Sequence, residues 1–474
     1  MPIANPWRCR WFRYSICHDD LDMTHIAVID IGKTNAKLAL VDAETLAERA
    51  VITRPNSVLP GPPWPHFDLD GHWQFLLSGL AQFHRDYGIA AISVTTHGAA
   101  AVFLDAAGGL AAPMLDYEHP GPDAMAAAYD ALRPDFAETG SPRLAMGLNL
   151  GAQLYWQLAT DPGLRARTHA IVTYPQYWGF LLTGELASDV SSLGCHSDLW
   201  NPWQGQFSTL VEKLGLAGVL APARLPGARL GGLLHKVAAQ TGIPAGTPVS
   251  VGIHDSNASI YPYLRARTGP FAVVSTGTWV VSMAVGAETT LLDATRDVLV
   301  NVSALGQPVP SARFMGGREF EIIAAGLGNS ILPEDRAQVL AAGLALLPAV
   351  EPASGPFAGR QMAWTAQPRT SGQKRVALSW YLALMTDTCL SLIGARGPVI
   401  VEGPFARNSD YLDMLASLRP EGVETAASTT GTAIGAALLM LRTAAPHATL
   451  RYGPEIDGPR YLQYARRWHS LLAR

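Results

Sequence analysis

A glycine turn between two apolar runs gathers the first residues whose types could do chemistry. Residues 25–42 read HIAVIDIGKTNAKLALVD. The polar positions in and around the turn are Asp30, Gly32, Lys33, Thr34, Asn35 and Lys37. Backbone N–H groups, hydroxyls and ammonium groups at a glycine turn suit phosphate oxygens, and a neighbouring carboxylate suits a hydrated metal ion. An ordinary surface hairpin is the alternative that this stretch alone leaves open.

The turn must be positioned by strands, and the rest of the chain supplies them. Two β-rich runs joined by a Gly/Asn turn predict a β-hairpin over residues 25–42. Buried strands are predicted at 91–95, ending in Thr96–His97–Gly98, and at 248–253, ending in His254–Asp255. Helical patterns lie between the strands, at 71–87 and 257–264, and residues 121–168 are alanine-rich and expected to be largely helical. The alternation predicts an α/β fold.

The opening hairpin recurs about half a chain later. Phe271–Val285 aligns with Ile26–Val41, so that Ser275 falls at Asp30 and Gly277 at Gly32. A later buried strand at 399–402 ends in Gly403, much as the strand at 91–95 leads to Gly98. The repetition predicts two homologous domains whose glycine turns face one cleft, where ligands usually bind. A chance likeness between two hairpins is the alternative.

Composition narrows the classes of protein that fit. The chain has 474 residues, a formal net charge of −4 and 48% hydrophobic residues. This size predicts two or three domains, and the charge gives no footprint for nucleic acid. No run of about 20 apolar residues predicts a membrane span. The four cysteines (Cys9, Cys17, Cys195 and Cys389) have no metal-like spacing and are expected to be reduced thiols of a cytoplasmic protein.

Residues 1–22 differ from the rest of the chain. They carry three arginines followed by three aspartates, without the apolar segment of a signal peptide, and Met23 stands directly before the first strand. We expect a dispensable N-terminal extension, or a start codon assigned too early.

The chain resembles the FGGY family of carbohydrate kinases over about residues 24–442. Six segments follow the family's order, and together they are far more specific than any one of them. They are DIGKTNAK (30–37), THGAAAVFLD with DYE (96–105 and 116–118), LTGELASD (182–189), VGIHDSNAS (251–259), STGTW (275–279), and EGPFARNSDYLDMLA with TGTAIGAALL (402–416 and 430–439).

The resemblance implies a fold and a division of labour. It implies two ribonuclease-H-like domains of the actin and hexokinase type on either side of a central cleft. Residues 24–265 would form the N-terminal domain with the sugar site, and residues 266–474 the C-terminal domain with the nucleotide site.

The resemblance also implies a nucleotide site, and the chain departs from the family pattern at two places in it. The residues implied to bind nucleotide are Gly32, Lys33, Thr34, Asn35, Lys37, Thr276, Gly277, Thr278, Gly403, Pro404 and Asn408. Lys33 stands where the family usually has threonine, which adds a positive charge near the expected phosphates or simply faces solvent. The adenosine motif keeps one glycine, Gly403, where the family carries two or three, so its adenine contacts are open.

Phosphoryl transfer to an alcohol needs a base for the hydroxyl proton and a metal ion for the phosphates. Asp255 follows an apolar strand, and the resemblance places the family's catalytic aspartate there. Its alternative role is to cap the helix that follows, which aspartate does well. Asp30 is the expected Mg²⁺ partner, through water, with Asp255 as the second metal-site carboxylate.

The implied sugar site combines polar groups with an aromatic wall. Its predicted residues are His97, Gly98, Asp116, Tyr117, Glu118, His254 and Asp255. The Gly-x-His-Asp form at Gly252–Asp255 is similar to the rhamnulokinase and fuculokinase branch of the family.

These observations predict an ATP-dependent kinase, with Mg²⁺, that phosphorylates a small-molecule sugar. The expected acceptor is a deoxy-ketohexose such as L-rhamnulose or L-fuculose, or a pentulose. A non-catalytic sugar- or nucleotide-binding protein of the same fold, and a kinase for a polyol or sugar acid, are the alternatives. No nucleic acid or membrane partner is expected, and a homodimer is one assembly that the sequence leaves open.

Overall fold

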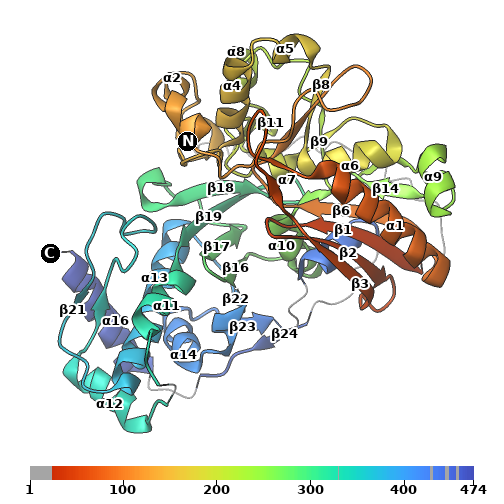
Figure 1. The fold of residues 1–474 in the computed structure, drawn as a ribbon. Coiled ribbons are helices and arrows are strands. Elements are labelled where there is room, and N and C mark those ends of the chain that lie inside the picture. Colours follow the sequence, from red (N-terminus) through yellow and green to blue (C-terminus); the bar gives the residue numbers. More distant parts are fainter. Residues whose placement is uncertain (1–23, 329, 427–430, 443–447, 455–457, 474) are drawn as a thin grey trace, which may run out of the picture.

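A computed structural model gives the fold, and it describes residues 24–328, 330–426, 431–442, 448–454 and 458–473. The expected N-terminal extension at 1–22, with Cys9 and Cys17, and Thr430 of the last motif lie outside these residues. Two mixed β-sheets with helices packed around them form the two halves of the molecule (Figure 1).

The first sheet contains the opening hairpin. Its strands are β1 (His25–Ile31), β2 (Asn35–Asp42), β3 (Glu48–Pro55), β6 (Ala91–Thr96), β13 (Arg229–Gly232), β14 (Pro248–Ser250) and β15 (Ile253–His254). The order is β13-β14-β6-β1-β2-β3, and β15 also pairs with β6. The hairpin predicted from residues 25–42 is confirmed, with Asp30 directly opposite Lys37. One face of this sheet is buried under α1 (Leu69–Tyr87), whose Leu76 and Leu80 are fully buried against it.

The second sheet repeats the first. Its strands are β16 (Phe271–Thr276), β17 (Val280–Val285), β18 (Val298–Val302), β19 (Pro308–Phe314), β22 (Val399–Glu402), β23 (Val423–Ala426) and β24 (Thr449–Arg451). β16 pairs antiparallel with β17 and parallel with β22, as β1 pairs with β2 and β6. The strands β3-β2-β1-β6-β14 and β19-β17-β16-β22-β23 therefore have the same order and directions. The predicted α/β fold with two ribonuclease-H-like halves is confirmed.

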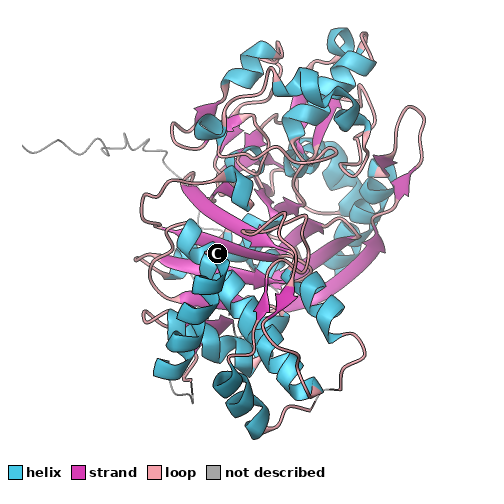
Figure 2. Ribbon diagram, turned by 90° about the vertical axis from the view of Figure 1, so that its left-hand side faces the viewer, coloured by secondary structure: helices cyan, strands magenta, loops and turns pink. Residues whose placement is uncertain are grey.

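Helices pack on the sheets and make each core. The longest, α13 (Ser371–Leu392), is buried along most of its length in the C-terminal core, beside α14 (Ser409–Leu418) and α16 (Gly458–Leu472). Helices flank the strands of the two large sheets (Figure 2). None of the helices in the described residues is long and apolar enough to cross a bilayer.

Two of the helices in the described residues, α15 (Gly431–Leu438) and α10 (Asp255–Ala266), join the halves. α15, from the C-terminal half, packs on β1 and β6 of the first sheet and on α10. Gly435 allows this approach, because a Cβ there would lie 1.8 Å from the carbonyl oxygen of Ala258. On its other side α10 buries Ile260 and Tyr263 against the second sheet. The division at residue 265 and the cleft between domains stay predictions.

The segment at 121–168 is less helical than its alanine content predicted. It contains α4 (Leu150–Thr160) and the short helices α2 (Ala126–Asp130), α3 (Phe136–Thr139) and α5 (Leu164–Arg167). Gly140 ends α3 with a φ of 63°, and Pro142 follows it. Glycine with positive φ and proline both interrupt helices, whatever the alanine content around them.

Candidate active site

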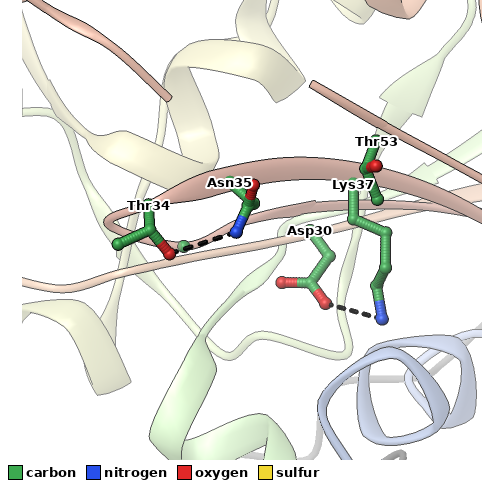
Figure 3. Close-up of a pocket in the computed structure, with 6 residues that line it drawn as sticks. Asp30, Thr34, Asn35, Lys37 and Thr53 are labelled. Atoms are coloured by element: carbon green, nitrogen blue, oxygen red, sulfur yellow. Dashed lines mark hydrogen bonds and ion pairs between the residues drawn. The ribbon is translucent and has the colours of Figure 1, made fainter. Parts of the chain in front are cut away.

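The turn after β1 borders a polar cavity of about 410 Å³ (Figure 3). Its lining residues are Asp30, Gly32, Thr34, Asn35, Lys37 and Thr53. Thr53 was missed from the sequence, although it lies directly opposite Lys37 in the pairing of β2 with β3. The turn is held by a Gly32 N–H bond to the Asn35 carbonyl (2.9 Å) and by the Asn56 amide, which donates to the Gly32 carbonyl (2.8 Å). Asn56 therefore holds the backbone of this turn in place. The turn's Thr34 and Asn35 line the cavity.

Asp30 is a half-buried carboxylate with the Lys37 ammonium beside it. Lys37 Nζ lies 3.2 Å from Asp30 Oδ2 and 3.3 Å from Glu48 Oε1. Burial raises the pKa of Asp30 above its usual range, Lys37 offsets part of this, and the charges of Asp255 and Glu48 raise it further. A divalent cation would relieve the repulsion between Asp30 and Asp255, so this pair fits a Mg²⁺ ion that keeps several waters.

Asp255 is the first residue of α10 and directly follows β15, which a break at residues 251–252 separates from β14. Gly252 makes that break with a φ of 95°, where a side chain would collide with the Val94 carbonyl. Asp255 Oδ1 accepts from the Ser256 N–H at 2.5 Å and lies 3.2 Å from His254 Nε2. Burial raises the pKa of Asp255 above its ordinary range, and His97 and the Ser256 hydrogen bonds offset part of that rise.

His254 is oriented by its own partner on α10. Asn257 Nδ2 donates to His254 Nδ1 at 3.2 Å, which leaves the ring proton on Nε2, facing Asp255. Burial lowers the pKa of His254 to about 4, so the ring is neutral near pH 7. Asn257, which the sequence did not single out, thus sets the tautomer that places the His254 Nε2–H beside the candidate base.

His97 presents the opposite polarity. Its Nδ1 donates to the Gly98 carbonyl at 2.8 Å, so Nε2 carries a lone pair. Nε2 is buried and has no hydrogen-bond partner within the part of the chain that the structure describes. Burial lowers the pKa of His97 to about 4. A buried acceptor without a partner costs free energy unless a ligand hydroxyl donates to it.

Gly98 is required by the packing of His254. A Cβ at position 98 would lie 2.7 Å from His254 Nε2 and 3.0 Å from its Cδ2. The absence of a side chain at Gly98 therefore leaves room for the His254 ring, whose Nε2 lies 3.2 Å from Asp255 Oδ1.

The predicted residues 116–118 surround a cation. Lys33 Nζ forms an ion pair with Asp116 and lies 3.2 Å from Glu118 Oε2. It also lies 4.5 Å from the centre of the Tyr117 ring and 5.0 Å from that of Phe67. The sequence placed Lys33 near the phosphates or in solvent; the structure instead places its ammonium among the predicted sugar-binding residues. Phe67 was missed from the sequence.

The turn of the second half divides its residues between surface and core. Gly277 and Thr278 are exposed, and the Gly317 N–H donates to the Thr278 carbonyl at 3.2 Å. Thr276 is buried: its hydroxyl donates to the Glu402 carbonyl and accepts from the Phe405 N–H at 3.1 Å. Its side chain thus ties β16 to the segment after β22, and nucleotide contact by these three residues stays a prediction.

The segment at 403–408 has structural duties of its own. Gly403 has a φ of 80°, and a Cβ there would lie 2.1 Å from the Thr276 carbonyl. Pro404 begins a single 3₁₀ turn, and Asn408 caps α14 by accepting from the Tyr411 N–H at 3.2 Å. Asn408 Nδ2 donates to Ser379 at 2.9 Å. Nucleotide binding by Gly403, Pro404 and Asn408 stays a prediction.

Comparison with known proteins decides the family. The family model for the N-terminal domain of the FGGY family of carbohydrate kinases matches residues 25–261. The model for the C-terminal domain of FGGY carbohydrate kinases matches residues 268–449. The chain belongs to the FGGY family of carbohydrate kinases. A crystal structure of a carbohydrate kinase from Novosphingobium aromaticivorans, 36% identical, superposes with a TM-score of 0.87 over 94% of this chain and 99% of that one.

Less similar proteins differ in what they are named for. L-fuculokinase of Salmonella typhi is 27% identical over 266 residues, which are 54% of this chain and 56% of the relative. The match thus spans little more than half the length of that curated relative. Xylulose kinase from Rhodospirillum rubrum, at 22% identity, a TM-score of 0.74 and coverage of 95% of this chain and 98% of that one, shows the fold alone.

Proposed function

We propose that the protein transfers the γ-phosphoryl group of ATP to a hydroxyl of a ketose, with Asp255 as the general base. The arrangement around Asp255 supports this most directly. His254 and Ser256 engage its Oδ1, which leaves Oδ2 as the oxygen that we assign to the acceptor hydroxyl. A neutral His254 lies beside the carboxylate, and the pKa of Asp255, raised by burial, suits a group that takes up a proton during the reaction.

The reaction divides between groups on this chain. The acceptor hydroxyl loses its proton to Asp255 as its oxygen forms a bond to the γ-phosphorus, and ADP leaves with the electrons of the broken bond. His97 Nε2 accepts a hydrogen bond from a second hydroxyl of the sugar, which fixes the orientation of the sugar. Thr34, Asn35 and Lys37 at the first turn, with Thr278 at the second, supply donors to the phosphates. Mg²⁺ held near Asp30 and Asp255 would neutralise phosphate charge when bound.

The acceptor we favour is a 6-deoxy-ketohexose such as L-fuculose or L-rhamnulose, or a pentulose, phosphorylated at O1. Its support is the His254–Asp255 pair and the partial likeness to L-fuculokinase. The buried thiols of Cys195 and Cys389 are free, which fits the cytoplasmic location we propose. A homodimer stays a prediction.

The test is ADP release in a coupled assay with MgATP and a panel of acceptors. The panel contains L-fuculose, L-rhamnulose, D-xylulose and L-ribulose, with glycerol, erythritol and gluconate as the polyol and acid alternatives. We expect the highest kcat/KM with one of the ketoses. Preference for glycerol or gluconate would replace the proposed acceptor class, and saturable sugar binding without ADP release would support the non-catalytic alternative.

A further inference from the structure

Lys33 lies in the same turn as the residues of the polar cavity but contacts a different part of the molecule. Thr34 and Asn35 line the cavity beside Asp30, whereas the Lys33 ammonium is paired with Asp116 and Glu118. Asp116 is 83 residues from Lys33 in the sequence. The exposed fraction of the side chain is only 10% for Asp116 and 23% for Lys33. The turn therefore borders both predicted subsites, and its lysine lies on the acceptor side.

The ammonium shares its aromatic surroundings with His97. The Phe67 and Tyr117 rings that lie near Lys33 Nζ also lie 5.1 and 5.4 Å, between ring centres, from His97. The positive charge of Lys33 also acts on His97, whose pKa it helps to lower. His97 in turn interacts with Asp255, the candidate base. Lys33 is therefore part of the cluster that would hold the acceptor.

We propose that Lys33 is a specificity-determining residue of the acceptor site, where its ammonium and the Asp116 carboxylate together bind neighbouring hydroxyls of a neutral sugar. This rests on the proposed kinase function. An ammonium has three N–H donors and a carboxylate only accepts, so the pair matches the oxygen lone pairs and the O–H donors of a vicinal diol. Phe67 and Tyr117 supply apolar ring faces for the C–H side of the sugar.

The charge balance of this cluster selects against anions. One ammonium stands beside two carboxylates, Asp116 and Glu118, so the cluster carries one net negative charge. A sugar acid or an already phosphorylated sugar would bring a second negative charge to a partly buried site, which weakens binding. Without Lys33, the two carboxylates would repel each other and would repel an anionic ligand more strongly.

The test separates an acceptor role from a phosphate role by measuring two affinities. Titration calorimetry with the best ketose of the panel, with gluconate and with MgADP is compared for wild type, Lys33→Met, Lys33→Thr and Lys37→Met. We expect Lys33→Met to weaken ketose binding about ten- to hundredfold, the loss of a hydrogen bond to a charged group, while MgADP affinity stays within twofold. Lys37→Met, on the cavity side, should show the reverse pattern.

The outcomes decide the proposal separately from kinase activity. Binding is read without turnover, so a wild-type protein that binds ketose but releases no ADP refutes the proposed function and leaves the Lys33 measurement intact. Lys33→Thr guards against misfolding, since threonine is the family's usual residue here. MgADP affinity that falls in both Lys33 variants while ketose affinity stays unchanged would overturn the proposal, as would unchanged affinity for both ligands or wild-type preference for gluconate.

Discussion

Replacing Gly98 by alanine tests whether His254 positions the candidate base. The added Cβ would lie 2.7 Å from His254 Nε2, while ordinary contact begins at 3.4 Å, so the ring must retreat by about 0.7 Å. His254 Nε2 lies 3.2 Å from Asp255 Oδ1, so a displaced ring would no longer hold its N–H at this position beside the carboxylate. If this N–H stabilises the charged base as much as a hydrogen bond to a charged group does, about 1.5–3 kcal/mol, its displacement should lower turnover about 10- to 150-fold.

The assay is steady-state ADP release, with kcat and KM determined separately for ATP and acceptor. We expect the loss in kcat, with KM for ATP unchanged, because ATP does not contact His254 in this account. Gly269→Ala is the matched control: Gly269 is exposed and a Cβ there meets no atom within 4 Å. If Gly98→Ala retains kcat within twofold of the control, at an unchanged melting temperature, His254 does not position the base.

Three further changes probe the metal site, a buried acid and the junction of the halves. Asp30→Asn should raise the Mg²⁺ concentration needed for half-maximal activity, and an unchanged Mg²⁺ titration would remove Asp30 from the metal site. Glu319 is 1% exposed and burial raises its pKa to about 7, so its protonation favours the folded state below that pH, and this contribution is lost as pH rises from about 4.5 to 7. The melting temperature of Glu319→Gln, relative to that of wild type, should therefore rise between pH 5 and 8. A constant difference between the two melting temperatures over this range would contradict this. Gly435→Ala, whose Cβ would meet the Ala258 carbonyl at 1.8 Å, should cost about 1–3 kcal/mol of stability and lower the melting temperature, whereas an unchanged melting temperature would mean that α15 shifts freely.

The sequence predicted the features that local pattern controls. Apolar runs on either side of a glycine turn specify the hairpin at residues 25–42, and the same pattern at 271–285 specifies its counterpart. The position of Asp255 at the end of a strand region also followed from local pattern, but the break at Gly252 did not. The excess helix expected at 121–168 came from counting alanine without weighing Gly140 and Pro142.

Features decided by distant contacts were beyond the sequence. Lys33 was assigned to phosphate or solvent because its neighbours in the turn suit phosphate; its ammonium is drawn to Asp116 by a contact across 83 residues. Thr276 and Asn408 were assigned to nucleotide from motif position, yet their hydroxyl and amide are held by backbone and side-chain partners inside the C-terminal half. The donor role of His254 depends on Asn257, one turn further along α10.

The kinetics of Asp255→Asn test the central claim most directly. Asparagine keeps the shape of the side chain and its Ser256 and His254 neighbours but cannot accept the hydroxyl proton. Ketose and MgADP binding by calorimetry should stay within a few-fold of wild type, which shows that the site is intact. Turnover should fall by about 10²–10⁴-fold. Near-normal turnover in this variant would contradict the assignment of Asp255 as the general base.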